Sequence, residues 1–173
     1  MSDQQNHVPG KITFLVCVDE SDDCRVATRL AALRARNTGG QVVLLYVIES
    51  VGIQHWAAVS EAMTAEGRQE AEERLQALAA EVYDYANIRP VLFVEEGRKI
   101  EQILKLIDKE PDINALVLGC APDGEGSNNL VQELTNELTK RLRIPLLIVP
   151  GNLTDEQIQN LTSNVQRSSV GRQ

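Results

Sequence analysis

The sequence predicts one α/β domain, doubly wound in the flavodoxin (Rossmann-like) manner, whose parallel sheet is covered by helices on both faces. Five apolar runs of six to nine residues, with little polar–apolar alternation, occur between residues 11 and 150. Strands buried on both faces of a parallel sheet have this composition. Segments with helical periodicity separate the runs, and the chain has no internal repeat and no Pro/Gly-rich linker. Five parallel strands in the order 3-2-1-4-5 accommodate this alternation.

The first strand–helix–strand unit occupies residues 11–49. Its first strand, KITFLVCVD, ends at Asp19. The helix that follows carries acidic residues in its first turn and basic residues towards its end, and Gly39-Gly40 stops it. The second strand, QVVLLYVIE, completes a unit whose crossover we expect to be right-handed.

Three further helices alternate with three further strands. A long helix is predicted from about Ala57 to about Tyr85, and the strand RPVLFVEEG follows it. The next helix, Arg98–Glu110, places apolar residues at i, i+3, i+4 and i+7, and Pro111 stops it. The strand INALVLG, a loop, a helix over Leu130–Leu142 and the strand PLLIVP complete the domain.

The composition of the two ends places the domain within residues 11–150. Residues 1–10 form a polar arm that we expect to be disordered. Residues 151–173 form a polar tail, in which Thr154 and Gln157 have the spacing of a capping box for a short helix through about Ser163. Because the tail is polar, we expect this helix to dock weakly or to fray.

The charge of the chain excludes two classes of partner. Seventeen basic and 25 acidic residues give a formal net charge of −8, and no Lys/Arg-rich run relieves it. A nucleic-acid backbone or an anionic membrane surface would be repelled, so neither is expected as a main partner. The amino-terminal stretch has no apolar signal region, and no run approaches a membrane span, so we expect a cytoplasmic protein.

Three cysteines, an odd number without C-x-x-C spacing, argue against a disulfide framework. Cys17 lies in the first strand and is predicted to be a core residue. Cys120, just after the fourth strand, is either an accessible thiol or a packing residue.

A family resemblance rests on the strand ends. The first strand ends in VCVDES, the second reads VVLLYVIE, and LVLG…IPLLIVP closes the domain. In order and spacing over residues 11–150, these segments resemble the universal stress protein (UspA-like) family. The resemblance implies a doubly wound α/β domain that acts as a stress-response or regulatory module, usually as a homodimer and without enzymatic activity. Many members bind ATP through the motif G-x-x-G, nine residues, then G-S or G-T, between the fourth strand and the fourth helix.

This chain keeps the frame of that motif but changes its residues. In the family's register, the first glycine is Gly119, the second position is Pro122, the third is Gln132 and the hydroxyl position is Glu133. Proline has no N–H to donate to a phosphate. A carboxylate about 5 Å from a phosphate costs roughly 1–3 kcal/mol. We therefore expect a branch of the family that does not bind ATP in the usual way and carries no cofactor.

The strand ends that face the same crevice are acidic. Because the carboxyl ends of parallel strands meet at one edge of the sheet, the carboxylates there form a rim that either holds Mg²⁺ or Ca²⁺ or is a solvated acidic surface, which is the commoner case. No metal ligand is assigned from the sequence. The rim comprises Asp19, Glu20, Glu49, Glu95 and Glu96, the loop adds Asp123 and Glu125, and Arg25, Arg98 and Lys99 are the nearby cations.

The candidate crevice residues are Asp19, Gly119, Gly124, Gly126 and Ser127. Asp19 matches an acidic position at the base of the adenine site in nucleotide-binding members; its alternative role is an N-terminal helix cap. Two glycines and a serine before a helix have the composition of a displaced phosphate nest, although glycines more often mark turns.

The sequence contains no catalytic constellation. No G-x-S-x-G occurs, and neither histidine stands beside a credible nucleophile or is paired with the other at ligand spacing. A phosphorylatable receiver domain of the same fold needs an Asp after the third strand and a Lys after the fifth, where this chain has Glu95-Glu96 and Pro150-Gly151. His55 and Trp56 either fold over the crevice, anchor an unidentified protein partner or pack against the sheet.

The fifth strand predicts a homodimer. Residues Pro145–Pro150 carry no charge and lie at a sheet edge, where unpaired backbone groups favour pairing with another chain. The alternative function is a nucleotide-binding switch with a rearranged phosphate loop, in which Mg²⁺ relieves the acidic repulsion, and a weak ATPase would require that switch. The sequence does not identify the physiological ligand, the partner or the stress.

Overall fold

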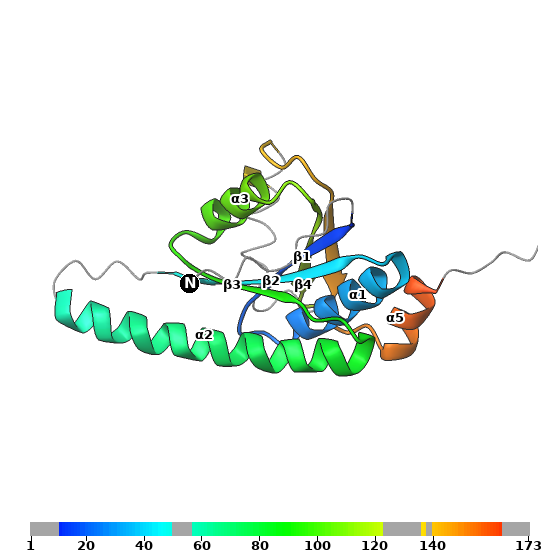
Figure 1. Cartoon of the computed structure of the whole chain (residues 1–173), viewed down its shortest axis with the longest axis horizontal. Coiled ribbons are helices and arrows are strands. Elements are labelled where there is room, and N and C mark those ends of the chain that lie inside the picture. Colours follow the sequence, from blue (N-terminus) through cyan, green and yellow to red (C-terminus); the bar gives the residue numbers. More distant parts are fainter. Residues whose placement is uncertain (1–10, 50–56, 123–135, 138–139, 164–173) are drawn as a thin grey trace, which may run out of the picture.

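The computed structural model describes residues 11–49, 57–122, 136–137 and 140–163, with the side chains of residues 57–64 outside the description. Its five strands are all parallel and follow the order β3-β2-β1-β4-β5, which confirms the predicted fold class (Figure 1). The strands are β1 (Thr13–Val18), β2 (Gln41–Ile48), β3 (Val91–Glu96), β4 (Ile113–Cys120) and β5 (Leu146–Pro150). The described helices are α1 (Asp23–Thr38), α2 (Ala57–Ala86), α3 (Lys99–Lys109) and α5 (Asp155–Thr162).

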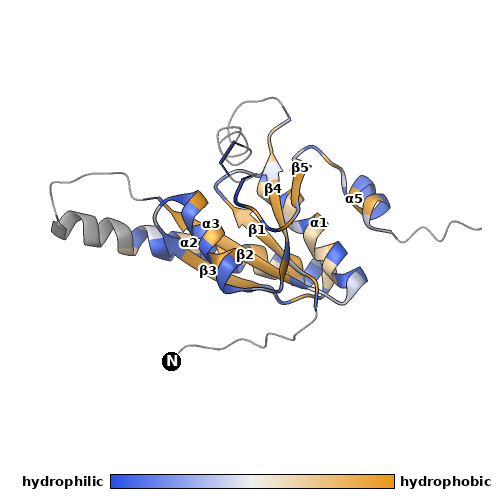
Figure 2. Ribbon diagram, turned by 90° about the horizontal axis from the view of Figure 1, so that it is seen from above, coloured by the Kyte–Doolittle hydropathy of each residue, from blue (hydrophilic) through white to orange (hydrophobic). Residues whose placement is uncertain are grey.

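The centre of the sheet divides the core into two layers. All six residues of β1 are buried, and its side chains alternate between the two faces. Phe14 and Val16 pack with α1 and α2 on one face, whereas Leu15 and Cys17 pack with α3 on the other. Cys17 is 4% exposed, which confirms it as a core residue. Figure 2 shows the result: strands that are apolar along their length, between helices with one polar face.

Helix α1 ends where the sequence predicted. Gly39, at φ 66°, adopts the left-handed conformation that glycine accepts without strain, and its N–H contacts the last carbonyls of the helix. Gly40 then passes so close to the Ile12 carbonyl that a side chain would not fit, and the next N–H, of Gln41, donates to that carbonyl at 2.8 Å. The stop therefore also starts β2 in the correct register beside β1.

Helices α2 and α3 also agree with their predicted spans. On α2, Leu75, Leu78, Val82 and Ala86 are buried against the sheet, and the amino-terminal part of the helix projects beyond the strands (Figure 1). On α3, the four apolar residues at helical spacing are all buried. The carboxyl end of α3 is held by Arg143, whose guanidinium donates to the Ile107 and Glu110 carbonyls. A cation at this position stabilises a helix terminus.

Helix α5 forms as predicted and packs on α1, and the expectation that it docks weakly stays a prediction. The capping box is present: Gln157 N donates to Thr154 Oγ1 at 3.3 Å, and Thr154 N donates to Gln157 Oε1 at 2.9 Å. The helix lies along α1 (Figure 1) and buries Ile158 completely. Ile158 is the main apolar anchor of the helix, and Leu153 packs against the same layer. The sequence analysis missed both residues because the tail is polar overall.

Some expectations fall on other parts of the chain. The polar arm of residues 1–10, and most of the helix expected over Leu130–Leu142, lie outside the described residues. Among the helices that the structure does describe, none combines the length and apolar character needed to cross a bilayer.

Candidate functional site

Two adjoining clefts lie where β1 and β2 end. The first, which we name the strand-end cleft, has a volume of about 490 Å³ and opens at the carboxyl ends of these strands. The second, the helix cleft, has a volume of about 500 Å³ and lies between the start of α1 and α2. Glu20, Ser21, Tyr46 and Glu70 line both. A separate hollow of about 550 Å³ lies between α1 and α5, with Arg36 and Gln159 in its lining, away from these strand ends.

The strand-end cleft is anionic. Among the described residues, four carboxylates, from Asp19, Glu20, Glu49 and Glu70, line it together with one cation, Lys99. Glu49 also accepts the backbone N–H of Lys99 at 3.4 Å, next to the start of α3. Negative groups brought into such a cleft are repelled from several sides.

The predicted acidic rim is therefore only partly one site. Asp19, Glu20 and Glu49 line the cleft, but Glu95 and Glu96 do not. Glu96 instead pairs with Arg68 of α2 at 3.3 Å. Within the described ranges, no three His, Cys, Asp or Glu side chains are close enough together to hold a metal ion.

Asp19 orders the turn between β1 and α1. Its carboxylate accepts from the backbone N–H of Ser21 at 2.9 Å and from the Ser21 hydroxyl at 2.5 Å. This is the local bonding by which aspartate mimics a backbone turn. The N-cap residue of α1 is Asp22, which makes no side-chain capping bond, so Asp19 is not the helix cap.

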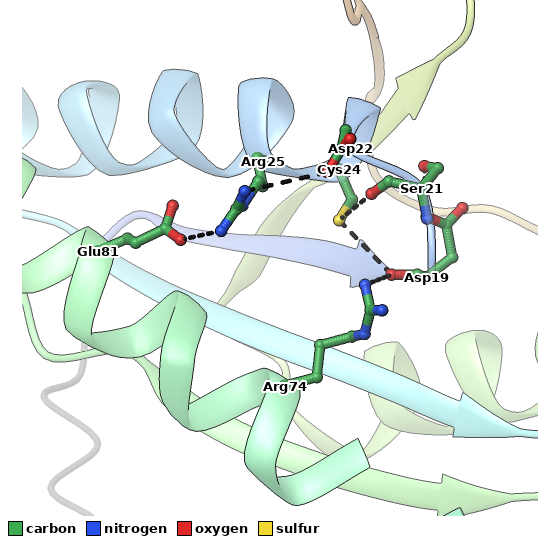
Figure 3. A network of polar contacts seen from close by, with 7 residues as sticks. All are labelled: Asp19, Ser21, Asp22, Cys24, Arg25, Arg74 and Glu81. Carbon is green, nitrogen blue, oxygen red and sulfur yellow. Dashed lines mark hydrogen bonds and ion pairs between the residues drawn. The ribbon is translucent and has the colours of Figure 1, made fainter. Parts of the chain in front are cut away.

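Helix α2 contributes charged side chains at these clefts that the sequence analysis missed. Its Arg74 Nη1 donates to the backbone carbonyl of Asp19 at 3.2 Å, and its Glu81 pairs with Arg25 of α1 at 2.5 Å (Figure 3). Arg68 and Arg74 are the only basic residues between Ala57 and Ala86. Two isolated arginines in an acidic helix were a usable signal, but periodicity does not predict which strand end they reach.

Gly119 serves close packing in this structure. A Cβ there would lie 2.5 Å from the Asp23 carbonyl oxygen and 2.8 Å from the Cys24 nitrogen, so the first turn of α1 rests directly on the end of β4. A Cβ on Gly151, just after β5, would overlap the Asp23 carboxylate. The N–H of Gly151 donates to the Cys120 carbonyl at 2.9 Å. The sequence identified Gly119 as a ligand candidate but not as a packing residue.

The remaining predicted site residues are placed as follows. Cys120 is half-buried, and Pro122 is exposed at the end of the described segment. Gly124, Gly126, Ser127, Gln132 and Glu133 lie outside the described residues, as do His55 and Trp56.

Cys24 is held in the helix cleft as a neutral thiol. Its sulfur lies 3.0 Å from the Ser21 carbonyl and 3.7 Å from the Asp19 carbonyl (Figure 3). Burial raises the pKa of Cys24 from 9.0 to about 11, and burial raises the pKa of Cys17 to about 12. Thiols with raised pKa values are poor nucleophiles at neutral pH.

These features define an α/β domain of the class that holds ligands at the carboxyl ends of its parallel strands. The sequence profile of the Universal stress protein family matches residues 13–150, and the chain belongs to this family. No curated protein sequence matches it.

Solved structures of universal stress proteins share the fold. Universal stress protein UspA from Lactobacillus plantarum is 18% identical, with a TM-score of 0.66 and 80% of this chain and 98% of that chain covered. A family member from Burkholderia pseudomallei is 17% identical, with a TM-score of 0.63 and 80% and 96% covered. The universal stress protein from Archaeoglobus fulgidus in complex with dAMP is 18% identical, with a TM-score of 0.54 and 80% and 97% covered.

The buried thiols predict a fall in stability at alkaline pH. The pKa of Cys24 is 9.0 in the unfolded chain and about 11 in the folded chain. The buried neutral thiol therefore contributes fully to the free energy of unfolding below pH 9, and this contribution is lost as the pH rises towards 11. The free energy of unfolding, from urea melts at each pH, is expected to fall between pH 9 and pH 11.

Cys24→Ala provides the matched comparison. Its free energy of unfolding should fall less steeply with pH over this interval, because one of the buried thiols is gone. Identical pH slopes for Cys24→Ala and the parent protein would contradict the assignment.

Proposed function

We propose that this member of the universal stress protein family is a homodimeric, cytosolic stress-response or regulatory module, without enzymatic activity, that does not bind ATP in the usual way. The observation that carries the proposal is the anionic strand-end cleft, where the described lining comprises Asp19, Glu20, Glu49 and Glu70 and one lysine. A triphosphate entering this cleft meets four carboxylates, and each close pair of like charges costs free energy.

The phosphate positions of the sequence support the same proposal. Pro122 has no N–H to offer, and Glu133 places a carboxylate where the family's motif has a hydroxyl. Gly119, the one motif glycine that remains, is in contact with the first turn of α1. Because Asp23 and Cys24 pack directly against this position, their packing alone accounts for the glycine, and no bound ligand is needed to explain it.

The second candidate function is a nucleotide-binding switch. It is favoured by the Archaeoglobus fulgidus relative of the same fold, which was solved in complex with dAMP. A monophosphate carries less charge than ATP, and Mg²⁺ bound to a nucleotide would reduce the repulsion further. Weak ATP hydrolysis would require this second function.

A calorimetric or thermal-shift titration with ATP and Mg²⁺ tests the proposal. We expect no saturable response, because the proposal is that the carboxylates of the cleft repel ATP. A ligand present at a hundred times its Kd would stabilise the fold by about 2.7 kcal/mol, which such a titration detects easily.

Adenosine and dAMP are the matched control ligands, since they keep the base but remove some or all of the phosphate charge. A saturable shift with ATP would overturn the proposal. Gly126 and Glu133, substituted separately, would then identify which register of the loop holds the phosphates.

The edge strand supports the homodimer. Residues Leu146–Pro150 carry no charge, β5 pairs only with β4 among the described strands, and Ile148 on β5 is 43% exposed. An apolar edge strand of this kind is a template for pairing with a second chain. A second copy of β5 is the pairing partner that we propose.

Light scattering with Ile148→Lys tests the dimer. We expect the parent protein to be a dimer at micromolar concentration and Ile148→Lys to be monomeric, because a charge on the edge opposes pairing. Leu161→Lys is the control, since Leu161 is also exposed, at 55%, but lies on α5. A monomeric parent protein, or an Ile148→Lys variant that stays dimeric, would contradict the dimer.

A further inference from the structure

The segment that follows β5 runs along α1. We name Gly151–Ser163 the carboxyl-terminal clasp. At the start of α1, Gly151 packs on the Asp23 carboxylate. Further along, Arg29 pairs with Asp155 at 3.1 Å, and Asn37 Nδ2 donates to the Thr162 carbonyl at 2.6 Å near the end of the helix. The clasp therefore contacts α1 at its beginning, its middle and its end.

The whole clasp lies outside the segment that matches the family profile. The family profile ends at residue 150, and the three related structures described above are covered over 96–98% of their own length while 80% of this chain is used. The family profile therefore assigns no role to the clasp. A role for it has to come from its contacts in this chain.

The first turn of α1, which the clasp contacts, is a wall of the helix cleft. Asp22, Cys24 and Arg25 line that cleft from α1, opposite Arg74 and Glu81 of α2. Besides the apolar packing of α1 on α2, two polar contacts cross the cleft: one from Arg25 of α1 to Glu81, and one from Arg74 to the Asp19 carbonyl in the turn before α1 (Figure 3). Both involve side chains that are accessible to water, and such contacts contribute little on their own.

We propose that the carboxyl-terminal clasp is a reversible cover that fixes the first turn of α1, and that its release loosens the helix cleft. The clasp is suited to reversible docking. A helix of eight residues is not stable alone in water, so α5 exists only while it is docked. One fully buried side chain, Ile158, supplies most of its apolar contact.

Because of where the clasp is attached, its release would affect the first turn of α1. It begins directly after Pro150, the last residue of the edge strand, and its first residue is bonded to the end of β4 through Gly151 N–H and the Cys120 carbonyl. A partner that draws α5 away would act on the first turn of α1 through Gly151 and Asp23. Segments of low local stability are the usual elements of such switches.

Cys24 is a natural reporter of this first turn. It is 2% exposed and bonded to carbonyls of the preceding turn, so it reacts with a thiol reagent only when the turn opens. Cys17, 4% exposed in the centre of the sheet, reacts only when the sheet itself opens. The two thiols separate local from global opening.

The experiment measures iodoacetamide labelling of each cysteine by peptide mass spectrometry at pH 8, in the full chain carrying Cys120→Ser. The test variants are Ile158→Asp, which places a charge in a fully buried position, and the milder Ile158→Ala. Leu161→Asp is the matched control on the exposed face of the same helix.

We expect the Ile158 variants to accelerate labelling of Cys24 by about tenfold or more while labelling of Cys17 is unchanged, and we expect Leu161→Asp to change neither. If Ile158→Asp opens the whole domain, Ile158→Ala decides. The proposal is overturned if Cys24 stays protected in both Ile158 variants. It is equally overturned if Cys24 and Cys17 accelerate together in both, because the clasp would then be an inseparable part of the core.

Discussion

The direct contact between the first turn of α1 and the ends of β4 and β5 is the constraint on which the rest of this structure depends. The contact requires that Gly119 have no Cβ, since a side chain there would overlap the backbone of Asp23 and Cys24, while Gly151 lies against the Asp23 side chain. It brings α1 close enough to the sheet for Cys24 to be buried. Because α1 is placed there, its first turn also forms one wall of the helix cleft.

The second feature of the structure is the negative charge of the strand-end cleft. The chain carries a net charge of −8, and four of its carboxylates meet in one cleft, three at the carboxyl ends of β1 and β2 and one, Glu70, on α2. The arginines of α2 neutralise part of this edge, but Arg68 is committed to Glu72 and Glu96, and Arg74 donates to a backbone carbonyl. The cations near the cleft thus serve to join helices to strands, which leaves the anionic character of the cleft in place.

The fold could be predicted from the sequence because its signals are local. Continuous apolar runs mark strands buried on both faces, and the predicted helix Arg98–Glu110 differs by one residue at each end from the observed Lys99–Lys109. The capping box of α5 is likewise local, since Thr154 and Gln157 are three residues apart.

The candidate site was less predictable because it depends on how the elements pack. Asp19 and Glu49 could be assigned to the cleft, since both follow parallel strands. The contact of Arg74 with the Asp19 carbonyl depends on how α2 crosses the sheet, and the docking of α5 depends on one isoleucine in a polar tail. Neither the crossing nor the docking surface leaves a periodic pattern in the sequence.

The central claim is that Gly119 allows the first turn of α1 to pack directly on the end of β4. The free energy of unfolding of Gly119→Ala, measured without any ligand, tests this claim most directly. Gly67→Ala is the matched control, because within the described part of the chain a Cβ at Gly67 meets only Ile48 Cγ2, at 3.9 Å. In urea unfolding, Gly119→Ala is expected to lose about 1–3 kcal/mol, as overpacked sites do, whereas Gly67→Ala in the middle of α2 should be neutral or more stable by up to about 1 kcal/mol. A Gly119→Ala variant as stable as the parent protein would contradict the claim.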